Sequence, residues 1–199
     1  MKHDPKSGET SPPNILILSA LGVSSVVGEE VIRLVSDQIV TKGGVPTVVA
    51  LKAQMLPLFH GEQDLVAFPS QATHMAQIIR DHRSLMIIAP EYHQGIAPLI
   101  KNSLDWAARA HTLSHRSPLL QGKAIGIVTV STETHLGVHA LTQMAALCHT
   151  LGGRILPGSM GVLDQERTLG EDRQIADKGL IKRLSALAGE LAEWRSHSL

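Results

Sequence analysis

The sequence predicts an α/β fold, a three-layer sandwich in which helices cover both faces of a five-stranded parallel sheet. Short apolar runs alternate along the chain with longer segments of helical periodicity, a pattern typical of parallel strands joined by right-handed helical crossovers. Two of the runs, residues 85–89 and 124–130, are almost continuously apolar, with Thr129 as the one polar residue, as expected for strands that are covered on both faces. The length of 199 residues suits a single domain of this kind.

The first half of the chain opens with an apolar run that stops at the polar loop beginning with Ser19. Apolar residues then recur at helical spacing, and Gly43 and Gly44 end that helix because glycine accepts the left-handed conformation of a helix cap. A long irregular stretch, residues 52–70, follows the second strand, and connections of this length often shape a site or an interface. The pattern predicts strands over 15–18 and 45–51 and helices over 29–40 and 72–81.

The second half repeats the alternation. Pro98 favours a helix start because its fixed φ suits the first turn, and Gly152 with Gly153 ends the next helix. The flavodoxin-like, doubly wound strand order 2-1-3-4-5 fits five strands in a domain that is predicted to span residues 14–195. Predicted strands cover 85–89, 124–130 and 154–156, the last extending toward 162, and predicted helices cover 98–110, 138–151 and 177–194.

Composition limits the partners that the chain can have. Lysine plus arginine and aspartate plus glutamate both number 18, so the basic character of a nucleic-acid-binding protein is missing. A net charge near zero favours self-association, which predicts a homo-oligomer. No apolar run approaches the roughly 18 residues of a membrane span. The histidines show no spacing typical of metal ligands, so we expect no metal site. The charge balance and the short apolar runs predict that neither nucleic acid nor a membrane is a partner.

The N-terminus and the cysteine content indicate the compartment. Residues 1–13 are polar and are expected to form a disordered leader, since they lack the apolar segment of a secretory signal. Cys148 is the only cysteine and can form no internal disulfide, which favours a reducing compartment. Its apolar neighbours predict a buried helix face rather than a nucleophile. We therefore expect a cytoplasmic protein.

Ligands of open parallel sheets bind beyond the carboxyl ends of the strands, where the strand order reverses. Three loops are expected to meet there, residues 19–25, 90–97 and 131–137. The first suits equally a phosphate held at the positive end of a helix and a plain turn whose serines cap that helix. The candidate ligand-binding residues of the three loops are Ser19, Gly22 and Ser25; Pro90, Glu91, Tyr92, His93 and Gly95; and Ser131, His135 and Gly137.

The second loop and the helix after it carry the most information. The loop places an aromatic residue, a glycine and two prolines directly after a buried strand, so its amides can bind the polar edge of a planar ring. On the helix, Lys101 and Asp105 are four residues apart and can form an ion pair, and Asn102 and Trp106 lie beside them. An amphipathic helix with a solvated charge pair is the simpler interpretation of these residues taken alone.

This segment resembles the NADPH-dependent FMN reductase family of flavodoxin-like proteins, which includes FMN, chromate, quinone and azo-dye reductases. The family's hallmark is Pro-Glu-Tyr-Asn followed, after a short stretch of Gly, Ser and Pro, by Leu-Lys-Asn-x-x-Asp-Trp. Here the chain reads Pro-Glu-Tyr-His from Pro90 and Ile-Lys-Asn-Ser-Leu-Asp-Trp from Ile100, in the same register. Leu-Pro-Leu-Phe from Leu56 also resembles the family's Leu-Pro-Leu-Tyr.

The resemblance implies bound FMN, with NADPH or NADH as the hydride donor and a small-molecule electron acceptor, in ping-pong turnover. It implies that His93, at the position of the family's asparagine, lies beside the flavin ring. There it can protonate the acceptor or stabilise the reduced ring, or it can simply fill the asparagine's space and donate a hydrogen bond, which is the simpler interpretation. It also implies a homodimer or homotetramer formed through residues 98–110 and 56–59, with Trp106 near the interface.

Two loops depart from the family pattern, and two other interpretations stay open. The third loop, which is glycine-rich in the family, keeps Gly137. One alternative is an electron-carrier flavodoxin, which the neutral charge and the Lys-Asn-x-x-Asp-Trp helix disfavour; the other is a non-catalytic relative with weakened FMN binding. The family's phosphate loop reads Gly-Ser-x-Arg-x-x-Ser-x-Asn. At its defined positions this chain has Ser19, Ala20, Gly22, Ser25 and Val27, so only the later serine of the pattern remains.

Overall fold

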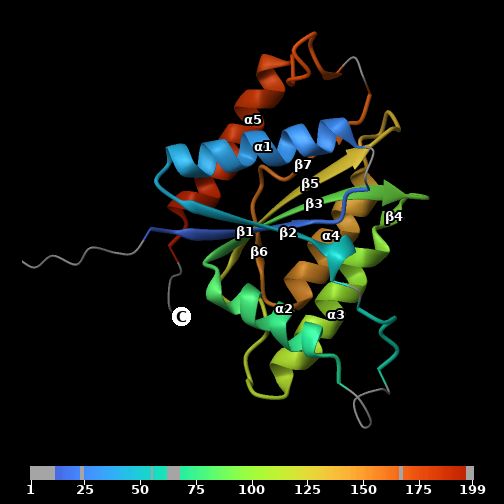
Figure 1. Cartoon of the computed structure of the whole chain (residues 1–199), viewed down its shortest axis with the longest axis vertical. Helices are drawn as coiled ribbons and strands as arrows, with labels where there is room; N and C mark the ends of the chain where they lie inside the picture. The colour runs from blue at the N-terminus through green and yellow to red at the C-terminus, as the bar shows by residue number, and fades with distance from the viewer. Residues whose placement is uncertain (1–11, 23–24, 55, 62–67, 166–167, 196–199) are drawn as a thin grey trace, which may run out of the picture.

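A parallel sheet forms the middle layer of the computed structural model, which describes residues 12–22, 25–54, 56–61, 68–165 and 168–195 (Figure 1). Most of the predicted leader, residues 1–11, therefore lies outside the described residues. The sheet has the order β2-β1-β3-β5-β6. Its strands are β1 (Asn14–Ser19), β2 (Val45–Ala50), β3 (Ser84–Tyr92), β5 (Ala124–Ser131) and β6 (Arg154–Ile155).

The edge of the sheet beside β5 is one interrupted strand. β6 pairs with Ala124 and Ile125, and β7 (Met160–Leu163) pairs in parallel with β5 further along, from Val128 to Ser131. Between the two pieces, the amide of Ile127 donates to Oγ of Ser159 at 3.0 Å. With β6 and β7 counted as one strand, the predicted order 2-1-3-4-5 and the predicted extension of the last strand toward residue 162 are both confirmed.

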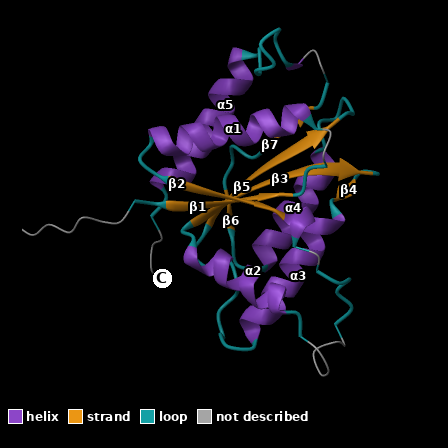
Figure 2. Ribbon diagram, in the orientation of Figure 1, coloured by secondary structure: helices purple, strands orange, loops and turns teal. Residues whose placement is uncertain are grey.

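Helices cover both faces of the sheet, as Figures 1 and 2 show. One face carries α1 (Val26–Thr41) and α5 (Lys178–Glu193). The other carries α2 (Ser70–Asp81), α3 (Pro98–Thr112) and α4 (Val138–Thr150). A short 3₁₀ turn, η1 (Leu51–Ala53), follows β2. Within the described residues, no helix is long and apolar enough to cross a membrane.

Alternation along the central strands separates two apolar cores. In β1, Ile15 and Ile17 pack under α1 and α5, whereas Leu16 and Leu18 pack against α2 and α3. All four side chains are fully buried. This strand therefore has no solvent-facing side, which explains its continuous apolar sequence and leaves only its carboxyl end available to a ligand.

The segment 90–97 is a β-hairpin, although the sequence predicts a loop. β3 continues through Tyr92, and β4 (Gly95–Ile96) turns back antiparallel to it, with Glu91 opposite Ile96. His93 and Gln94 form the two-residue turn with φ of 50° and 60°. Such turns usually carry asparagine or glycine because both central residues need positive φ. The pair His-Gln therefore gives no sequence signal for the hairpin.

Candidate functional site

The carboxyl ends of β1, β3 and β5 lie at the same edge of the sheet, and side chains tie the predicted loops together there. Ser131, at the end of β5, donates its hydroxyl to Oε2 of Glu91 in β3 at 3.4 Å. Ser19, at the end of β1, is buried, and its Oγ accepts from the amide of Leu21 at 3.4 Å. Gly22 is exposed, and residues 23 and 24 of this first loop lie outside the described residues.

The carboxylate of Glu91 is the junction between the second and third loops. Its side chain is only 3% exposed, and Oε2 lies 2.6 Å from Nε2 of His135. Its other oxygen, Oε1, accepts from the amide of Ala140 at 3.3 Å, in the first turn of α4. A carboxylate is favoured there because the amino end of a helix carries partial positive charge. Glu91 is therefore bound by groups of the protein itself.

His135 is oriented by this contact. When the ring is neutral, the proton lies on Nε2 and is donated to Glu91, which leaves Nδ1 as an acceptor. No partner of Nδ1 exists among the described residues, and about a third of the side chain, 31%, is exposed. The ring of His139 is tilted against it, with centroids 5.4 Å apart. One nitrogen of His135 is thus fixed and the other is free to meet a ligand.

The third loop has a conformation that glycine makes possible. Leu136 and Gly137 have φ of 57° and 69°, and the carbonyl of Leu136 accepts from Oγ1 of Thr129 at 2.8 Å. A Cβ on Gly161 in β7 would lie 1.8 Å from that carbonyl oxygen, so the loop can rest on this edge strand only where the side chain is absent. Gly161 was not predicted from the sequence, although an isolated glycine within a strand pattern indicates such a close approach.

The tip of the hairpin is exposed and held from below. Tyr92 is 50% exposed, and His93 and Gln94 are exposed as well. Gln143 of α4 accepts from the amide of Ile96 at 3.0 Å and donates to the carbonyl of Gln94 at 3.2 Å. Two adjacent non-glycine residues with positive φ are a costly conformation that persists where the surroundings impose it. Gln143 supplies part of this constraint, and no local motif announces it.

The first loop ends at a helix cap with an acidic partner. Ser25 precedes α1, and its Oγ accepts from the amide of Gly28 at 3.1 Å. The same hydroxyl donates to Oδ2 of Asp164, the residue directly after β7, at 2.9 Å. This cap explains why α1 begins at Val26, three residues before the predicted start. The sequence interpretation missed Asp164 because a single aspartate 139 residues away carries no local signal.

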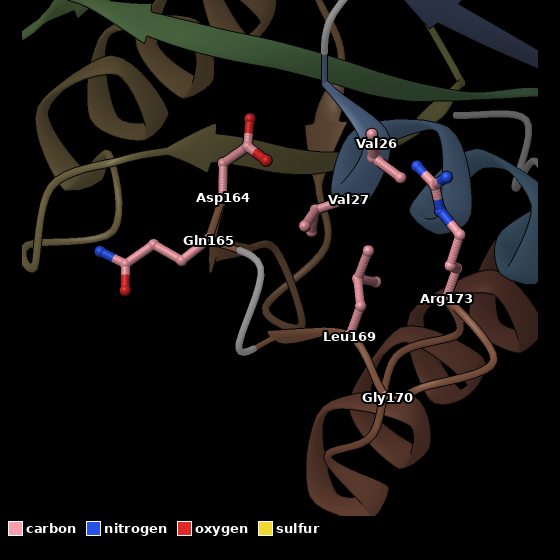
Figure 3. A pocket seen from close by; sticks show the side chains of 7 residues that line it. All are labelled: Val26, Val27, Asp164, Gln165, Leu169, Gly170 and Arg173. Atoms are coloured by element: carbon pink, nitrogen blue, oxygen red, sulfur yellow. The ribbon is translucent and has the colours of Figure 1, made fainter.

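A cavity of about 470 Å³ opens beside this cap (Figure 3). Val26 and Val27, in the first turn of α1, form one wall, and their amides have no helical acceptor because of their position. Figure 3 places Arg173 and Asp164 on opposite sides of the hollow. The complete lining is Val26, Val27, Asp164, Gln165, Leu169, Gly170 and Arg173.

The helix motif that follows the second loop is structural. Asn102 accepts from the amide of Phe59 at 2.8 Å and donates to the carbonyl of Pro57 at 2.9 Å. The indole of Trp106 donates to the same carbonyl at 2.7 Å, and this side chain is 1% exposed. Phe59 meets Trp106 edge to face at 5.1 Å between centroids. The motif therefore fastens segment 56–59 to α3, and it leaves Leu58 78% exposed.

The structure also shows the outcome of two other predictions, an ion pair and a buried cysteine. The predicted ion pair between Lys101 and Asp105 is present, with Nζ 2.5 Å from Oδ2. Cys148 is free and fully buried, and burial raises the pKa of its thiol to about 12. A thiol that stays protonated is a poor nucleophile, so the prediction of a structural cysteine is confirmed.

Comparison with known sequences connects the chain to reductases. The sequence model described as NADPH-dependent FMN reductase matches residues 13–167. An NADPH azoreductase of Bacillus sp. (strain OY1-2) is 27% identical over 143 residues, which cover 68% of this chain and 73% of that protein. A 2-hydroxy-1,4-benzoquinone reductase of Burkholderia sp is 33% identical over 85 residues, covering 41% of this chain and 46% of that protein. The second match thus spans less than half of the relative's length.

Solved structures give the same architecture at low identity. The flavoenzyme NAD(P)H:(acceptor) oxidoreductase FerB from Paracoccus denitrificans superimposes with a TM-score of 0.75 at 14% identity, covering 92% of this chain and 96% of that one. A flavodoxin from the domain Archaea gives a TM-score of 0.58 at 8% identity, covering 90% and 96%. At such identities the similarity shows the fold alone, and it is the predicted flavodoxin-like fold.

Proposed function

Because the chain belongs to the family of NADPH-dependent FMN reductases, we propose that it passes a hydride from NAD(P)H, by way of bound FMN, to a small-molecule acceptor. Family membership makes the protein an oxidoreductase whose cofactors are FMN and a nicotinamide nucleotide. The observation that carries the proposal is the junction at Glu91, which holds the hairpin and the third loop together at the carboxyl edge of the sheet. When bound, FMN supplies the hydride chemistry, and the protein supplies position and electrostatics.

The relatives support a quinone or azo compound as the acceptor. One is named an azoreductase, and others are named 2-hydroxy-1,4-benzoquinone reductase and quinone reductase. Free flavins and metal oxyanions belong to the same proposal, because a hydride donor at an open site can reduce acceptors of different shape. We propose ping-pong turnover, in which the acceptor takes the place of the oxidised nicotinamide.

The ring end of the site suits a flavin. Tyr92 and the exposed turn at His93 offer an aromatic face and polar groups, and Gly95 keeps the returning strand close to Tyr92. His135 offers a free ring nitrogen from the opposite loop. We propose that these four residues border the isoalloxazine. Pro90, Glu91, Ser131 and Gly137 support them by holding β3 and the third loop in place.

His93 is the proposed proton donor to the acceptor. Its side chain is exposed at the hairpin tip, and imidazole exchanges protons near neutral pH. Reduction of a quinone by a hydride leaves an oxyanion that must take up a proton, and an imidazolium at the ring edge can donate it from a ring nitrogen. The left-handed backbone at His93 sets the direction of its Cα–Cβ bond at the turn.

The phosphate end fits FMN less well. Ser19, Gly22 and Ser25 are the proposed contacts, but Ser19 is buried and Ser25 is bound to a carboxylate. This observation favours the second candidate function, a flavodoxin-like protein that binds FMN weakly and serves as an electron carrier or has no catalytic role. The two candidates differ in whether NADPH is consumed.

We also propose that the protein forms a homodimer or homotetramer. Leu58 projects from a segment whose neighbours Pro57 and Phe59 are both bonded to Asn102, so an apolar side chain stands on a rigid support. Trp106 would act beneath this surface rather than in it, since it is almost fully buried within the chain. Light scattering at micromolar concentration should give a dimeric or tetrameric mass, and Leu58→Asp should reduce it. A monomeric mass for the unchanged protein contradicts this part of the proposal.

A cytoplasmic location completes the proposal, supported by the single cysteine, Cys148, which can form no internal disulfide. The function itself is tested by NADPH consumption with a quinone acceptor, measured with and without added FMN. We expect consumption that depends on FMN and on protein concentration. Background consumption, together with loss of FMN on gel filtration, would overturn the reductase and leave the non-catalytic alternative.

A further inference from the structure

We propose that Asp164 is a specificity-determining residue, which occupies the hydroxyl of Ser25 so that the site binds a flavin ring without favouring the 5′-phosphate. The ligand class is then flavins in general, with riboflavin bound about as well as FMN. This inference rests on the proposed flavin site and concerns its phosphate end alone.

The hydrogen bonds of Ser25 carry the first step. A serine hydroxyl has one proton to donate. That proton goes to Oδ2 of Asp164 at 2.9 Å, while a lone pair of the same oxygen accepts from the amide of Gly28 at 3.1 Å. A phosphate oxygen could receive the proton only after the contact with Asp164 is broken. The serine that remains from the family's phosphate loop is therefore already engaged by the protein.

Charge carries the second step. A phosphate oxygen at hydrogen-bond distance from Oγ of Ser25 would lie within roughly 6 Å of the Asp164 carboxylate, because Oδ2 of Asp164 is itself 2.9 Å from that Oγ. Two anions at that distance repel each other, more strongly in a partly buried site than in water. The carboxylate also meets the positive amino end of α1, which is the feature that otherwise attracts a phosphate.

The surroundings do not cancel this charge by direct contact. Within the described part of the chain, no cation forms an ion pair with Asp164. Val27, at the last position of the phosphate-loop pattern, is buried and has no polar side-chain atom to donate. Arg173 lines the same cavity from the opposite side and is exposed (Figure 3). It is the residue through which a phosphate could still be held, and the experiment includes it.

The experiment titrates the full-length protein with FMN and, separately, with riboflavin, following flavin fluorescence. For the unchanged protein we expect dissociation constants for the two flavins within about threefold of each other, since the phosphate gains no net contact. Asp164→Asn keeps an acceptor for Ser25 and removes the charge. It should tighten FMN by about tenfold and leave riboflavin unchanged. Glu190→Gln, an exposed change on α5, makes the same change in net charge away from the cavity and should leave the ratio of the two constants unaltered.

Three outcomes overturn the inference. The first is FMN bound more than about thirtyfold tighter than riboflavin by the unchanged protein. The second is an Asp164→Asn variant that alters both flavins equally or neither. The third is an Arg173→Gln variant that weakens FMN but not riboflavin, because a cation would then hold the phosphate. If neither the unchanged protein nor any variant binds either flavin, the proposed function fails and the inference fails with it. If riboflavin binds but one of these three outcomes is found, only the inference fails.

Discussion

Oε2 of Glu91 lies 2.6 Å from Nε2 of His135, and this contact joins a central strand to the loop after the neighbouring strand. The carboxylate is almost fully buried and also meets the first turn of α4. Glu91, a predicted ligand contact, therefore forms a junction between the hairpin and the third loop, and we propose that it affects a bound flavin through these two segments.

Glu91→Gln tests this junction. The substitution keeps the shape but removes the charge, and the amide cannot match the three donors as well as a carboxylate can. We expect a loss of about 1–3 kcal/mol in the free energy of unfolding, the range for hydrogen bonds to a charged group. Urea denaturation followed by circular dichroism measures it. Glu133→Gln, an exposed change in the third loop, is the control and should shift stability little. Equal losses from both variants would show that Glu91 does not hold the hairpin and the third loop together.

His93→Gln tests the proposed proton donor. We expect kcat with a quinone to fall by about tenfold or more, at the low end of the range for general acid catalysis. Ferricyanide takes up electrons without protons, so the rate with this acceptor should change little. His74→Gln, on the exposed face of α2, is the matched control. Equal losses with both acceptors would mean that His93 positions the flavin and does not transfer a proton.

Asn102→Ala tests the attachment of segment 56–59. The variant loses the bonds to the carbonyl of Pro57 and the amide of Phe59. The Phe59 amide is left without this acceptor, whereas the Pro57 carbonyl keeps its bond to the indole of Trp106. We expect a loss of about 2–3 kcal/mol in the free energy of unfolding. Lys101→Ala removes an exposed ion pair on the same helix and should cost about 0.5 kcal/mol or less. Similar costs for the two variants would show that the segment is not held by Asn102.

The buried His111 predicts how stability depends on pH. Burial lowers its pKa from the ordinary value of 6.5, and His115, Arg80 and Lys123 lower it further, while the hydrogen bond to the carbonyl of Ser117 acts in the opposite direction. Above pH 6.5 the ring is neutral in both states and contributes no pH dependence. As the pH falls below 6.5, the unfolded chain binds a proton that the folded chain does not. Stability should therefore decrease until the lowered folded pKa is passed.

The measurement is the free energy of unfolding at a series of pH values for the unchanged protein and for His111→Gln. The variant should lose part of the decline below pH 6.5, whereas His115→Gln, which changes a more exposed ring stacked on His111, should lose less. Identical pH profiles for the unchanged protein and His111→Gln would rule out this residue as the cause.

The fold could be predicted because its signals are local. Continuous apolar runs in β3 and β5 and the periodicity of the helices follow from burial on both faces of a sheet. Errors arose where a tertiary contact decided the structure. α1 begins at Val26 because Ser25 caps it, and the hairpin at His93 forms although its turn residues are unfavourable.

The site could be predicted only as a set of converging loops. Chain order and the doubly wound topology bring these loops together, so their meeting follows from the fold. The partners that orient the residues are non-local: Glu91 contacts His135 across 44 residues, and Ser25 contacts Asp164 across 139. No local pattern encodes such pairs. The same limit applies to Gln143, which supports the hairpin from α4.

The most direct test of the central claim is anaerobic mixing of NADPH with the flavin-loaded protein, followed in the visible flavin absorbance. We expect the absorbance to bleach several orders of magnitude faster than that of free FMN. We also expect the absorbance to return when a quinone is added, with no flavin released. Bleaching at the rate of free FMN, or no recovery with quinone, would contradict a flavin-dependent reductase.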